Sequence, residues 1–414
     1  MSTIFIQIAA YRDPQLVPTL DDCIAKAKFP ENLRFGICWQ HDSEESLGKY
    51  QKDKRFRIVD VPFEKSQGAC WARNQLQQKY KNETYTLQLD SHHRFIQDWD
   101  VELIEMLESL RSAKCKKPVL TSYISSWDPD NDPNGRVNIP WGMNFDRFTP
   151  EGVVFFLPAN MPDFKDLKKP VRARFYSAHF CFADGSFCKE VPHDPDYYFH
   201  GEEISIAVRA FTHGYDLFHP HKIIAWHEYT RKGRTKQWDD DKTWHEKNVR
   251  CHKRNRILLG MEPNIDNIDF GIYGLGKKRT LKDYEKYAGI QFKTRAVQQY
   301  TLDKKYPPNP AFKSEKLYQD SFLKIFRHCI DIQYAQVPEN DYEFWVVAFH
   351  GPNGENIFRK DADRNEINRM MQDKDKYCKI WREFNAEETP AYSVVWPYSK
   401  SKGWCDQIKQ MIKR

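Results

Sequence analysis

The sequence predicts an α/β protein built around a largely parallel, doubly wound sheet. Short apolar segments of β type alternate with segments of helical spacing, and polar residues follow directly after several of the apolar segments. Alternating strands and helices are typical of a parallel sheet that is covered by helices. The chain has 414 residues, 40% of them hydrophobic. This length is sufficient for one large domain and a smaller one.

The first half of the chain supplies most of the expected sheet. We predict strands at 3–10, 33–40, 56–63, 85–90 and 118–125, and helices at 16–30, 68–80 and 99–113. The segment 127–142 is rich in Pro, Asn and Asp, which predicts a long surface loop. In sheets of this kind ligands bind beyond the carboxyl ends of the strands, so the loop is expected near the site.

The second half completes the sheet by about residue 230. We predict strand, turn and strand over 171–192, a helix at 201–215, a short buried strand within 216–229, and a loop followed by a helix over 272–292. The expected domains are a large α/β domain at 1–300, a Pro-rich linker at 301–316 and a small C-terminal α+β accessory domain at 317–414.

Composition excludes several classes of protein. The 64 basic and 58 acidic residues leave a net charge of +6 without a concentrated basic face, so we expect no nucleic-acid partner. No apolar run approaches the ~20 residues that span a bilayer. The N-terminus has no secretory leader and the ten cysteines are scattered, so we expect a cytoplasmic protein with reduced thiols. The oligomeric state stays open.

A candidate metal site lies in "LQLDSHHRF", residues 87–95. If the strand continues through this segment, Asp90 and His92 point to the same side, because side chains alternate with period two. His93 then points away and is expected to pack or hydrogen-bond. His227 also follows a short apolar segment and is the best candidate for a third ligand. One carboxylate and two imidazoles suit an intermediate divalent cation such as Mn²⁺. A D-x-H triplet alone also occurs by chance.

Two further segments contain candidate ligand-binding residues. Gly68 and Arg73 lie at the start of the helix in "QGACWARNQL", where a small residue admits close approach and a guanidinium can meet a phosphate. Glu202 and Glu203 follow a glycine at another predicted helix start. A helix cap for the glutamates and a surface role for Arg73 are the alternatives.

Taken in order, several motifs give the chain a resemblance to a known family. They are "IFIQIAAYRDPQL", "LRFGICWQ", "GACWARN", "LQLDSHHRF", "FHGEEISIAVRAFTHGYDLF", "AWHEYTR" and "YGLGKKRTLKDYEKYAGI". Over residues 3–293 the sequence resembles GT-A glycosyltransferases. More narrowly, it resembles the cytoplasmic polypeptide N-acetylglucosaminyltransferases that modify hydroxyproline on the adaptor subunit of a ubiquitin ligase. It is more distantly similar to the mucin-type polypeptide GalNAc-transferases.

The resemblance implies a retaining, Mn²⁺-assisted transfer of N-acetylglucosamine (GlcNAc) from UDP-GlcNAc to a hydroxyl. The acceptor would be hydroxyproline or Ser/Thr in a polypeptide, or a glycan. Asp90, His92 and His227 match the metal ligands of the mucin-type enzymes, with Ser91 in between. Glu202 or Glu203 would hold the sugar or acceptor or act in catalysis, although "HGEE" departs from the "GGEN"-like stretch of those enzymes.

Other residues would bind the donor and acceptor. Ala9, Tyr11 and Arg12 would border the uracil and ribose, and Gly68 and Arg73 would lie near the ribose and diphosphate. Cations stabilise the departing UDP, so Arg231, Lys232 and Arg234 are expected to fold over the diphosphate. The candidates for stacking on sugar or acceptor are Trp127, Trp141, Phe180, Phe182, Tyr197 and Tyr198.

Two other functions remain possible from the sequence. A metal-dependent phosphodiesterase or hydrolase would use the same ligand types, but it predicts a second cluster of carboxylates, which the sequence does not clearly offer. A non-catalytic sugar- or partner-binding relative is the other alternative. Such a relative would have lost catalytic activity, and the presence of Asp90, His92 and His227 argues against this loss.

Overall fold

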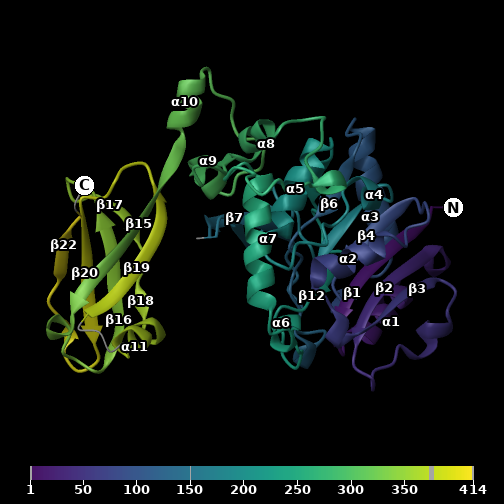
Figure 1. Ribbon diagram of the computed structural model, residues 1–414, viewed down its shortest axis with the longest axis horizontal. Coiled ribbons are helices and arrows are strands. Elements are labelled where there is room, and N and C mark those ends of the chain that lie inside the picture. Colours follow the sequence, from purple (N-terminus) through teal and green to yellow (C-terminus); the bar gives the residue numbers. More distant parts are fainter. Residues whose placement is uncertain (1, 150, 373–376, 413–414) are drawn as a thin grey trace. The chain divides into compact units, whose positions relative to one another are not determined.

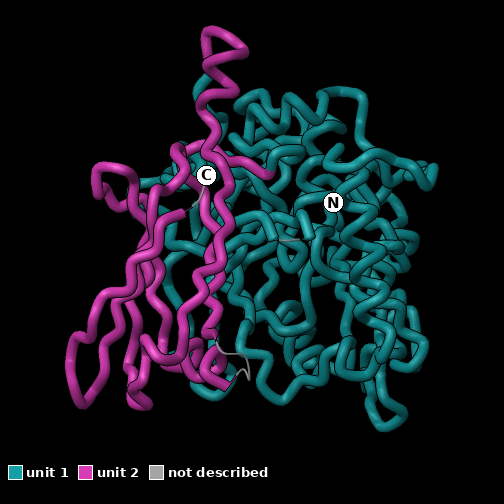
Figure 2. The backbone as a smooth tube through the Cα atoms, turned by 60° about the vertical axis from the view of Figure 1, so that its left-hand side comes forward, with its two compact units in different colours: residues 1–294, 300–311 teal, residues 295–299, 312–414 magenta. Residues whose placement is uncertain are grey.

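The computed structural model describes residues 2–149, 151–372 and 377–412. The chain forms two compact units, residues 1–294 with 300–311 and residues 295–299 with 312–414 (Figure 2). The predicted linker 301–316 is therefore divided between the units. Its first part belongs to unit 1 because buried Arg174 donates hydrogen bonds to the Lys305 carbonyl at 2.5 Å and to Asn309 Oδ1 at 2.6 Å.

Unit 1 is built on a central sheet with strand order β3-β2-β1-β4-β10-β6-β11-β9 (Figure 1). Its strands are β1 (Ile4–Tyr11), β2 (Leu33–His41), β3 (Phe56–Pro62), β4 (Tyr85–Leu89), β6 (Pro118–Thr121), β9 (Val171–Arg172), β10 (Phe180–Asp184) and β11 (Asp216–His219). Strands β1 to β4 are parallel, whereas β10 is antiparallel to both β4 and β6. The predicted α/β class with a mainly parallel sheet is confirmed.

Helices cover both faces of this sheet. Ile8 of β1 belongs to the core under α1 (Leu16–Lys26) and α3 (Trp99–Ser112), whereas the next residue, Ala9, packs toward α2 (Ala69–Gln77). Alternate side chains of one strand therefore enter two different cores, as expected for a doubly wound sheet.

The strand order reverses between β1 and β4. From β1 the sheet continues through β2 and β3 on one side, and through β4 on the other. Ligands of open α/β sheets bind beyond the carboxyl ends of the strands at such a switch point. A short antiparallel ribbon, β5 (His93–Phe95) with β12 (Ala225–His227), lies directly after β4.

Several segments differ from the sequence prediction. The stretch 171–192 contains β9, β10 and then the short helix α4 (Phe187–Glu190), so its last part is not a strand. A hairpin of β7 (Trp141–Phe148) and β8 (Val154–Asn160) was not predicted, and it ends the long loop at Trp141. The remaining helices and strand of unit 1 are α5 (Glu202–Thr212), α6 (Gln237–Asp240), α7 (Trp244–Leu258), α8 (Leu281–Ala288) and β13 (Ile290–Gln291), and α9 (Gln299–Leu302) spans the unit boundary.

Unit 2 consists of two layers of antiparallel strands with small helices. One layer contains β14 (Ala296–Gln298), β15 (Phe322–Gln333) and β19 (Tyr377–Ala386). The other contains β16 (Tyr342–His350), β17 (Asn356–Arg359), β18 (Ala362–Asp363), β20 (Tyr392–Ser399), β21 (Gly403–Trp404) and β22 (Ile408–Met411). The helices are α10 (Glu315–Asp320) and α11 (Arg364–Met371), and Trp345, Phe349 and Ile380 lie in the core. Among the described residues, no helix has the length and apolarity needed to cross a membrane.

Candidate active site

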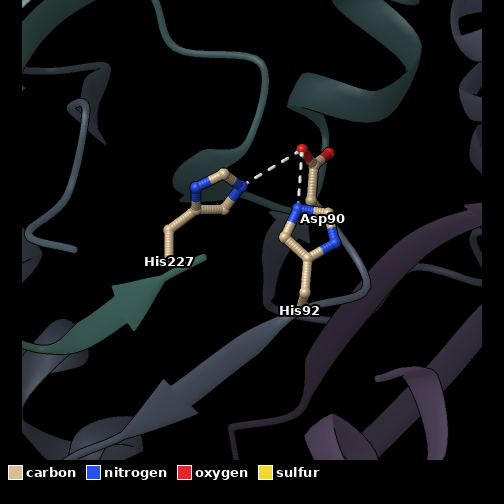
Figure 3. A group of neighbouring side chains, drawn as sticks. All are labelled: Asp90, His92 and His227. Carbon is tan, nitrogen blue, oxygen red and sulfur yellow. Dashed lines mark hydrogen bonds and ion pairs between the residues drawn. The ribbon is translucent and has the colours of Figure 1, made fainter. Parts of the chain in front are cut away.

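Asp90, His92 and His227 come together beyond the carboxyl end of β4 (Figure 3). One potential ligand atom of each lies within 4.8 Å of the others. Oδ2 of Asp90 is 3.4 Å from Nε2 of His227 and 3.8 Å from Nε2 of His92. The carboxylate thus faces both imidazoles.

The reason for this proximity differs from the one that the sequence suggested. Strand β4 ends at Leu89 and β5 begins at His93, so Asp90 and His92 lie in the turn between two strands. The β5–β12 ribbon then pairs His93 with His227. The turn and this pairing, rather than alternation along one strand, bring the three side chains together.

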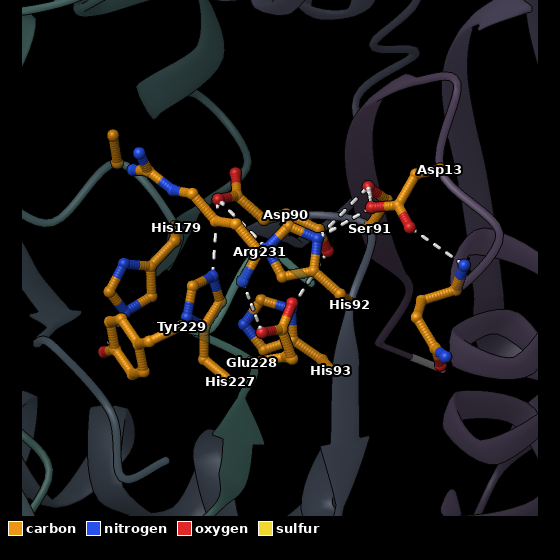
Figure 4. Close-up of polar contacts among 12 residues, drawn as sticks. Asp13, Asp90, Ser91, His92, His93, His179, His227, Glu228, Tyr229 and Arg231 are labelled. Atoms are coloured by element: carbon orange, nitrogen blue, oxygen red, sulfur yellow. Dashed lines mark hydrogen bonds and ion pairs between the residues drawn. The ribbon is translucent and has the colours of Figure 1, made fainter. Parts of the chain in front are cut away.

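A buried carboxylate holds the ring of His92 (Figure 4). Oδ2 of Asp13, just past the end of β1, lies 2.8 Å from Nδ1 of His92 and accepts the Ser91 hydroxyl at 2.6 Å. Burial alone would raise the pKa of Asp13, but the hydrogen bonds from His92 and Ser91 outweigh it, and the pKa is lowered. An ionised carboxylate can only accept a hydrogen bond, so Nδ1 of His92 donates to Asp13 and Nε2 is the nitrogen that faces Asp90.

The ring of His227 is packed among other aromatic rings. It stacks on His179 at 4.2 Å between ring centroids, and Tyr229 meets it edge-on at 4.3 Å. Burial lowers the pKa of His179 and His227 well below the usual value, so both imidazoles stay neutral, and that of His227 can serve as a ligand. His93 is fully buried with Nδ1 at 2.9 Å from the Asp90 carbonyl. It packs and hydrogen-bonds beside the cluster, as the sequence predicted.

Arg73 on α2 lies next to the cluster. Its guanidinium is buried and donates from Nη2 to Oδ1 of Asp90 at 3.0 Å, while Nη1 lies 3.7 Å from Glu202. Burial alone would raise the pKa of Asp90, but the hydrogen bond with His227 and the charge of Arg73 lower it well below the usual value. Nε and Nη1 of Arg73 are buried and have no hydrogen-bond partner among the described residues.

Glu202 and Glu203 begin α5 but differ in their surroundings. Glu203 accepts the Tyr123 hydroxyl at 2.6 Å and the Ala178 N–H at 2.9 Å, so both of its oxygens are engaged. For Glu202 the partner is Arg73. Burial raises the pKa of both carboxyl groups, and for Glu202 the charge of Glu203 adds to this effect. Glu202 is therefore the carboxyl group that is freer to contact a ligand.

The basic segment after His227 is only partly directed at the cluster. Arg234 pairs with buried Glu228 at 2.6 Å, and its Nη1 lies 2.5 Å from Nδ1 and 3.0 Å from Nε2 of His92. Lys232 is exposed and pairs with Asp130, and Arg231 lies over the Trp238 ring. Of the three cations predicted over the diphosphate, Arg234 lies at the cluster, whereas Arg231 and Lys232 have surface partners in this structure.

Residues at the end of β1 meet the helix that follows this segment. Asp240 of α6 accepts the Tyr11 hydroxyl at 2.7 Å and pairs with Arg12 at 3.0 Å, and Arg12 also pairs with Asp42 at 3.3 Å. Ala9 is half-buried against the core under α2. The segment between His227 and α6 therefore connects the carboxyl ends of β1 and β12.

Gly68 has a packing role in this structure. It precedes α2 with φ of 106°, a backbone conformation that favours glycine. A Cβ added there would lie 2.9 Å from the Tyr198 ring and 3.0 Å from the Tyr198 carbonyl oxygen. The space beside Gly68 is thus filled by Tyr198 in this structure, and the close approach of a ligand to Gly68 stays a prediction.

Most of the aromatic candidates are interior residues. Phe180 and Phe182 are fully buried in the core of the sheet, and Tyr197 and Tyr198 pack in a buried cluster with Cys251. Trp127 is buried and donates to the His92 carbonyl at 3.3 Å. These rings are buried in this structure and their stacking on a sugar stays a prediction, whereas Trp141 is half-exposed, with its ring 5.9 Å from that of Tyr229.

The cluster fits a divalent cation. It offers one carboxylate oxygen and two imidazoles, a mixed donor set suited to Mn²⁺. The bond from Nδ1 to Asp13 leaves Nε2 of His92 facing Asp90, as in the carboxylate–histidine pairs of metal sites. In this structure Nη1 of Arg234 lies 3.0 Å from that Nε2, so the guanidinium must shift for a metal to bind. Among the described residues, this is the one group with such spacing, and the second cluster expected of a two-metal hydrolase is not found.

The sequence prediction did not include Asp13, Tyr123, His179 and Glu228. Two of them had a local signal: Asp13 follows the first strand at the switch point, and Glu228 is adjacent to His227. His179 and Tyr123 had none, because β10 and the chain after β6 bring them to the cluster only when the sheet is assembled.

The fold and the cluster define an α/β protein with a candidate metal site and a buried arginine at its ligand crevice. The chain belongs to the glycosyltransferase (GlcNAc) family, whose model matches residues 3–54 and 49–294. This membership agrees with the GT-A class that the sequence predicted. No curated protein gives a significant match to the sequence.

Two solved structures are similar to this chain at low sequence identity. The structure of GalNAc-T7 with UDP, GalNAc and Mn²⁺ has a TM-score of 0.43 and 15% identity, over 68% of this chain and 54% of that chain. The chain thus spans about half the length of the GalNAc-T7 chain that it matches. The structure of S. aureus TarS 1–349 with UDP-GlcNAc has a TM-score of 0.35 and 10% identity, over 64% of this chain and 77% of that chain.

Proposed function

We propose that this glycosyltransferase transfers GlcNAc from UDP-GlcNAc to a hydroxyl with retention of configuration, assisted by Mn²⁺. The acceptor is a polypeptide hydroxyl, on hydroxyproline or Ser/Thr, or a glycan hydroxyl. The observation that carries the proposal is the arrangement of Asp90, His92 and His227 beside Arg73, whose buried Nε and Nη1 have no hydrogen-bond partner among the described residues. A buried cation with free N–H groups beside three metal ligands suits an anionic diphosphate. The family model supports the sugar.

The reaction requires stabilisation of negative charge on the departing UDP. Asp90, His92 and His227 would hold the metal, which when bound supplies Lewis-acid stabilisation of the diphosphate. Arg73 donates its free N–H groups to the phosphate oxygens. Arg234, in the segment after His227, is the second cation near the diphosphate. Arg73 is held by Asp90 before the reaction begins, so little reorganisation of its charge is needed as the glycosidic bond breaks.

The carboxyl groups of α5 orient the sugar and acceptor. Their raised pKa keeps a proton on a carboxyl group to a higher pH than usual, which favours hydrogen bonding to a hydroxyl over nucleophilic attack. Glu202 is proposed to contact the sugar, and Glu203, held by Tyr123 and Ala178, to support it. We therefore propose that the acceptor hydroxyl attacks from the side of the leaving group without a covalent glycosyl-enzyme.

The test is UDP release by the full chain from a panel of UDP-sugars, in Mn²⁺ and in EDTA. UDP-GlcNAc in Mn²⁺ should give the highest rate, and Asp90→Asn should reduce it by at least about 100-fold. The proposal fails if no UDP-sugar is turned over or if Asp90→Asn has wild-type activity. Mass spectrometry of proteins modified on co-expression identifies the acceptor. The cytoplasmic location stays a prediction.

A further inference from the structure

His179 lies directly before β10, beside the candidate metal ligands (Figure 4). Strand β10 is antiparallel to β4 with Phe180 opposite Leu89, so His179 is at the end of the sheet where the ligand cluster follows β4. Its ring stacks on that of His227 at 4.2 Å and on that of Tyr123 at 5.1 Å between centroids. Tyr123 in turn donates to Glu203 of α5. His179 therefore borders both the cluster and the glutamates.

The hydrogen bonds of His179 determine which ring nitrogen carries the proton. The backbone N–H of Ile124 donates to Nε2 of His179 at 3.3 Å, and the Tyr229 hydroxyl lies 3.2 Å from the same nitrogen. A backbone N–H can only donate, so Nε2 is an acceptor and carries no proton. The ring is then neutral and its single proton is on Nδ1. His179 thus presents a fixed N–H donor at its other nitrogen.

This Nδ1–H is not used by the protein. It has no hydrogen-bond partner among the residues that the structure describes. Nε2 of His93 and Nδ1 of His227 are also unpartnered but are enclosed by protein, whereas Nδ1 of His179 keeps some exposed surface in a side chain that is 7% exposed overall. In Figure 4 Nε2 of His179 is on the side of Tyr229, and Nδ1 is on the side of Asp90. The donor therefore faces the crevice.

His219 of β11 is a buried histidine with the same backbone contact. Its Nε2 accepts the Met143 N–H at 3.3 Å, as Nε2 of His179 accepts that of Ile124. Its Nδ1, however, lies 2.7 Å from the Thr121 carbonyl oxygen and donates to it, so the protein satisfies both nitrogens. The two histidines differ only at Nδ1, which in His179 is left for a group from outside the chain.

We propose that Nδ1–H of His179 donates a hydrogen bond to an oxygen atom of the sugar in the bound UDP-sugar. This inference rests on the proposed function, because the diphosphate must bind at Asp90, His92 and His227. The sugar is bonded directly to that diphosphate, so it lies next to the metal ligands. His179 is the side chain that borders these ligands on the side of α5, whose glutamates are proposed to orient the same sugar.

A sugar oxygen fits this donor better than the other oxygens of the two substrates. Diphosphate oxygens are charged, and the buried guanidinium of Arg73 offers them a stronger, charge-assisted hydrogen bond. The acceptor hydroxyl loses its proton in the reaction, so a group that assists it must accept a proton. Nδ1 of His179 already carries a proton and can only donate. An uncharged hydroxyl or carbonyl oxygen of the sugar is the partner that remains.

The test compares the binding of UDP-GlcNAc and of UDP to the full chain in Mn²⁺ by titration calorimetry. In His179→Gln the side-chain carbonyl can still accept from the Ile124 N–H near the position of Nε2, but the donor at Nδ1 is lost. We expect this variant to bind UDP-GlcNAc about tenfold more weakly than wild type. Its affinity for UDP, which has no sugar beyond the diphosphate, should stay within about twofold of wild type.

A second variant restores the donor without the ring. In His179→Asn the amide N–H group lies near the position of Nδ1, so we expect most of the affinity for UDP-GlcNAc to be kept. Both variants lose the imidazole ring, so the comparison between them isolates the N–H donor from the ring stacking. The matched control is His219→Gln, which should bind both ligands within about twofold of wild type. Thermal unfolding checks that all three variants are folded.

Three results would overturn the inference. Unchanged affinity of His179→Gln for UDP-GlcNAc would mean that the sugar does not use this donor. An equal loss for UDP and UDP-GlcNAc would mean that His179 acts on the diphosphate through His227. An equal loss of UDP-GlcNAc affinity in His179→Gln and His179→Asn would mean that the ring, and not its N–H group, is what matters.

Failure of the proposed function would look different from failure of this inference. If wild-type protein binds neither UDP nor UDP-GlcNAc and turns over no UDP-sugar, the proposed function fails and the inference fails with it. If wild type and His179→Gln bind and turn over UDP-GlcNAc equally well, the proposed function stands and only the role of His179 is refuted.

Discussion

Nη2 of Arg73 donates to Oδ1 of Asp90 at 3.0 Å, while Oδ2 of the same carboxylate faces Nε2 of His227 at 3.4 Å. One carboxylate therefore connects the cation of α2 to the candidate metal ligands. Because Oδ1 contacts Arg73 and Oδ2 faces the imidazole, a metal can bind Oδ2 without breaking the contact with Arg73.

Replacing Arg73 by lysine tests whether its positive charge is sufficient or whether the planar guanidinium is needed. A lysine keeps the charge but offers a single ammonium group, which cannot reach Asp90 and a phosphate as the planar guanidinium can. Arg73→Lys should lower the rate of UDP release by about 100-fold with little change in Mn²⁺ affinity. Arg57→Lys is the control, because Arg57 pairs with Glu83 at the amino end of the sheet's strands. Equal activity of the two variants would contradict a role for Arg73 at the diphosphate.

Removing Asp13 should weaken metal binding. Without its carboxylate the Nδ1–H of His92 loses its acceptor, and the proton is no longer held on that nitrogen. Asp13→Ala should reduce Mn²⁺ affinity by about 10- to 100-fold in electron paramagnetic resonance titrations. Asp13→Asn should lose less, since an amide oxygen still accepts from Nδ1–H. The surface variant Asp21→Ala serves as control, and an unchanged affinity in Asp13→Ala would refute the positioning role.

The buried glutamate at the start of α5 should make stability depend on pH. Burial raises the pKa of Glu202 in the folded chain above its value in the unfolded chain, so the folded state binds more protons and loses stability as pH rises between the two values. Glu202→Gln removes this loss. Relative to wild type, its free energy of unfolding should increase from pH 5 to pH 9, by about 1 kcal/mol or more.

Glu83 gives a control of opposite sign. Burial would raise its pKa, but the hydrogen bond from Arg57 outweighs this and lowers it. Its contribution to stability is therefore present above the pKa of the unfolded chain and is lost as pH falls through the folded-state value. Glu83→Gln should destabilise the chain at neutral pH. Thermal unfolding of Glu202→Gln and Glu83→Gln is measured across pH. If the stability of both variants relative to wild type changed with pH in the same direction, the opposite pKa shifts of the two glutamates would be contradicted.

Donor binding should protect the segment after His227. Lys232 and Arg231 are at the surface, whereas Arg234 and Asp240 contact His92, Arg12 and Tyr11 at the crevice. A bound diphosphate adds partners for the basic side chains, so UDP with Mn²⁺ should slow trypsin cleavage at residues 231–234 several-fold. Cleavage at the exposed residues 313 and 316 of unit 2 provides an internal control. Equal slowing at both places would point to a general effect on trypsin.

The part of the fold that depends on local pattern could be read from the sequence. The strands at the start of the chain have continuous apolar runs, since they are buried on both faces, and their helices have a clear apolar stripe. The short ribbon of β5 and β12 and the hairpin of β7 and β8 could not be read in this way. Their strands are short or mixed in polarity, and pairing with a distant segment is what makes them strands.

The candidate site also has residues that the local sequence pattern predicts and residues that it does not. Asp90, His92 and His227 were found because each follows an apolar run, and ligands of such sheets gather beyond strand ends. The aromatic residues could not be placed in this way, because an aromatic side chain in a β segment has the same local pattern whether it faces the crevice or, as Phe180 does, the core.

The sequence by itself indicated the class of fold, the GT-A glycosyltransferases and three residues that follow or end short strands, since periodicity and short motifs are properties of neighbouring residues. Only the tertiary structure decided that Asp13 holds His92, that Arg234 rather than Lys232 reaches the cluster, and that Tyr198 fills the space beside Gly68. These contacts join residues that are distant in the chain, and the order of strands in the sheet brings them within a few ångströms. A one-dimensional pattern does not contain that order.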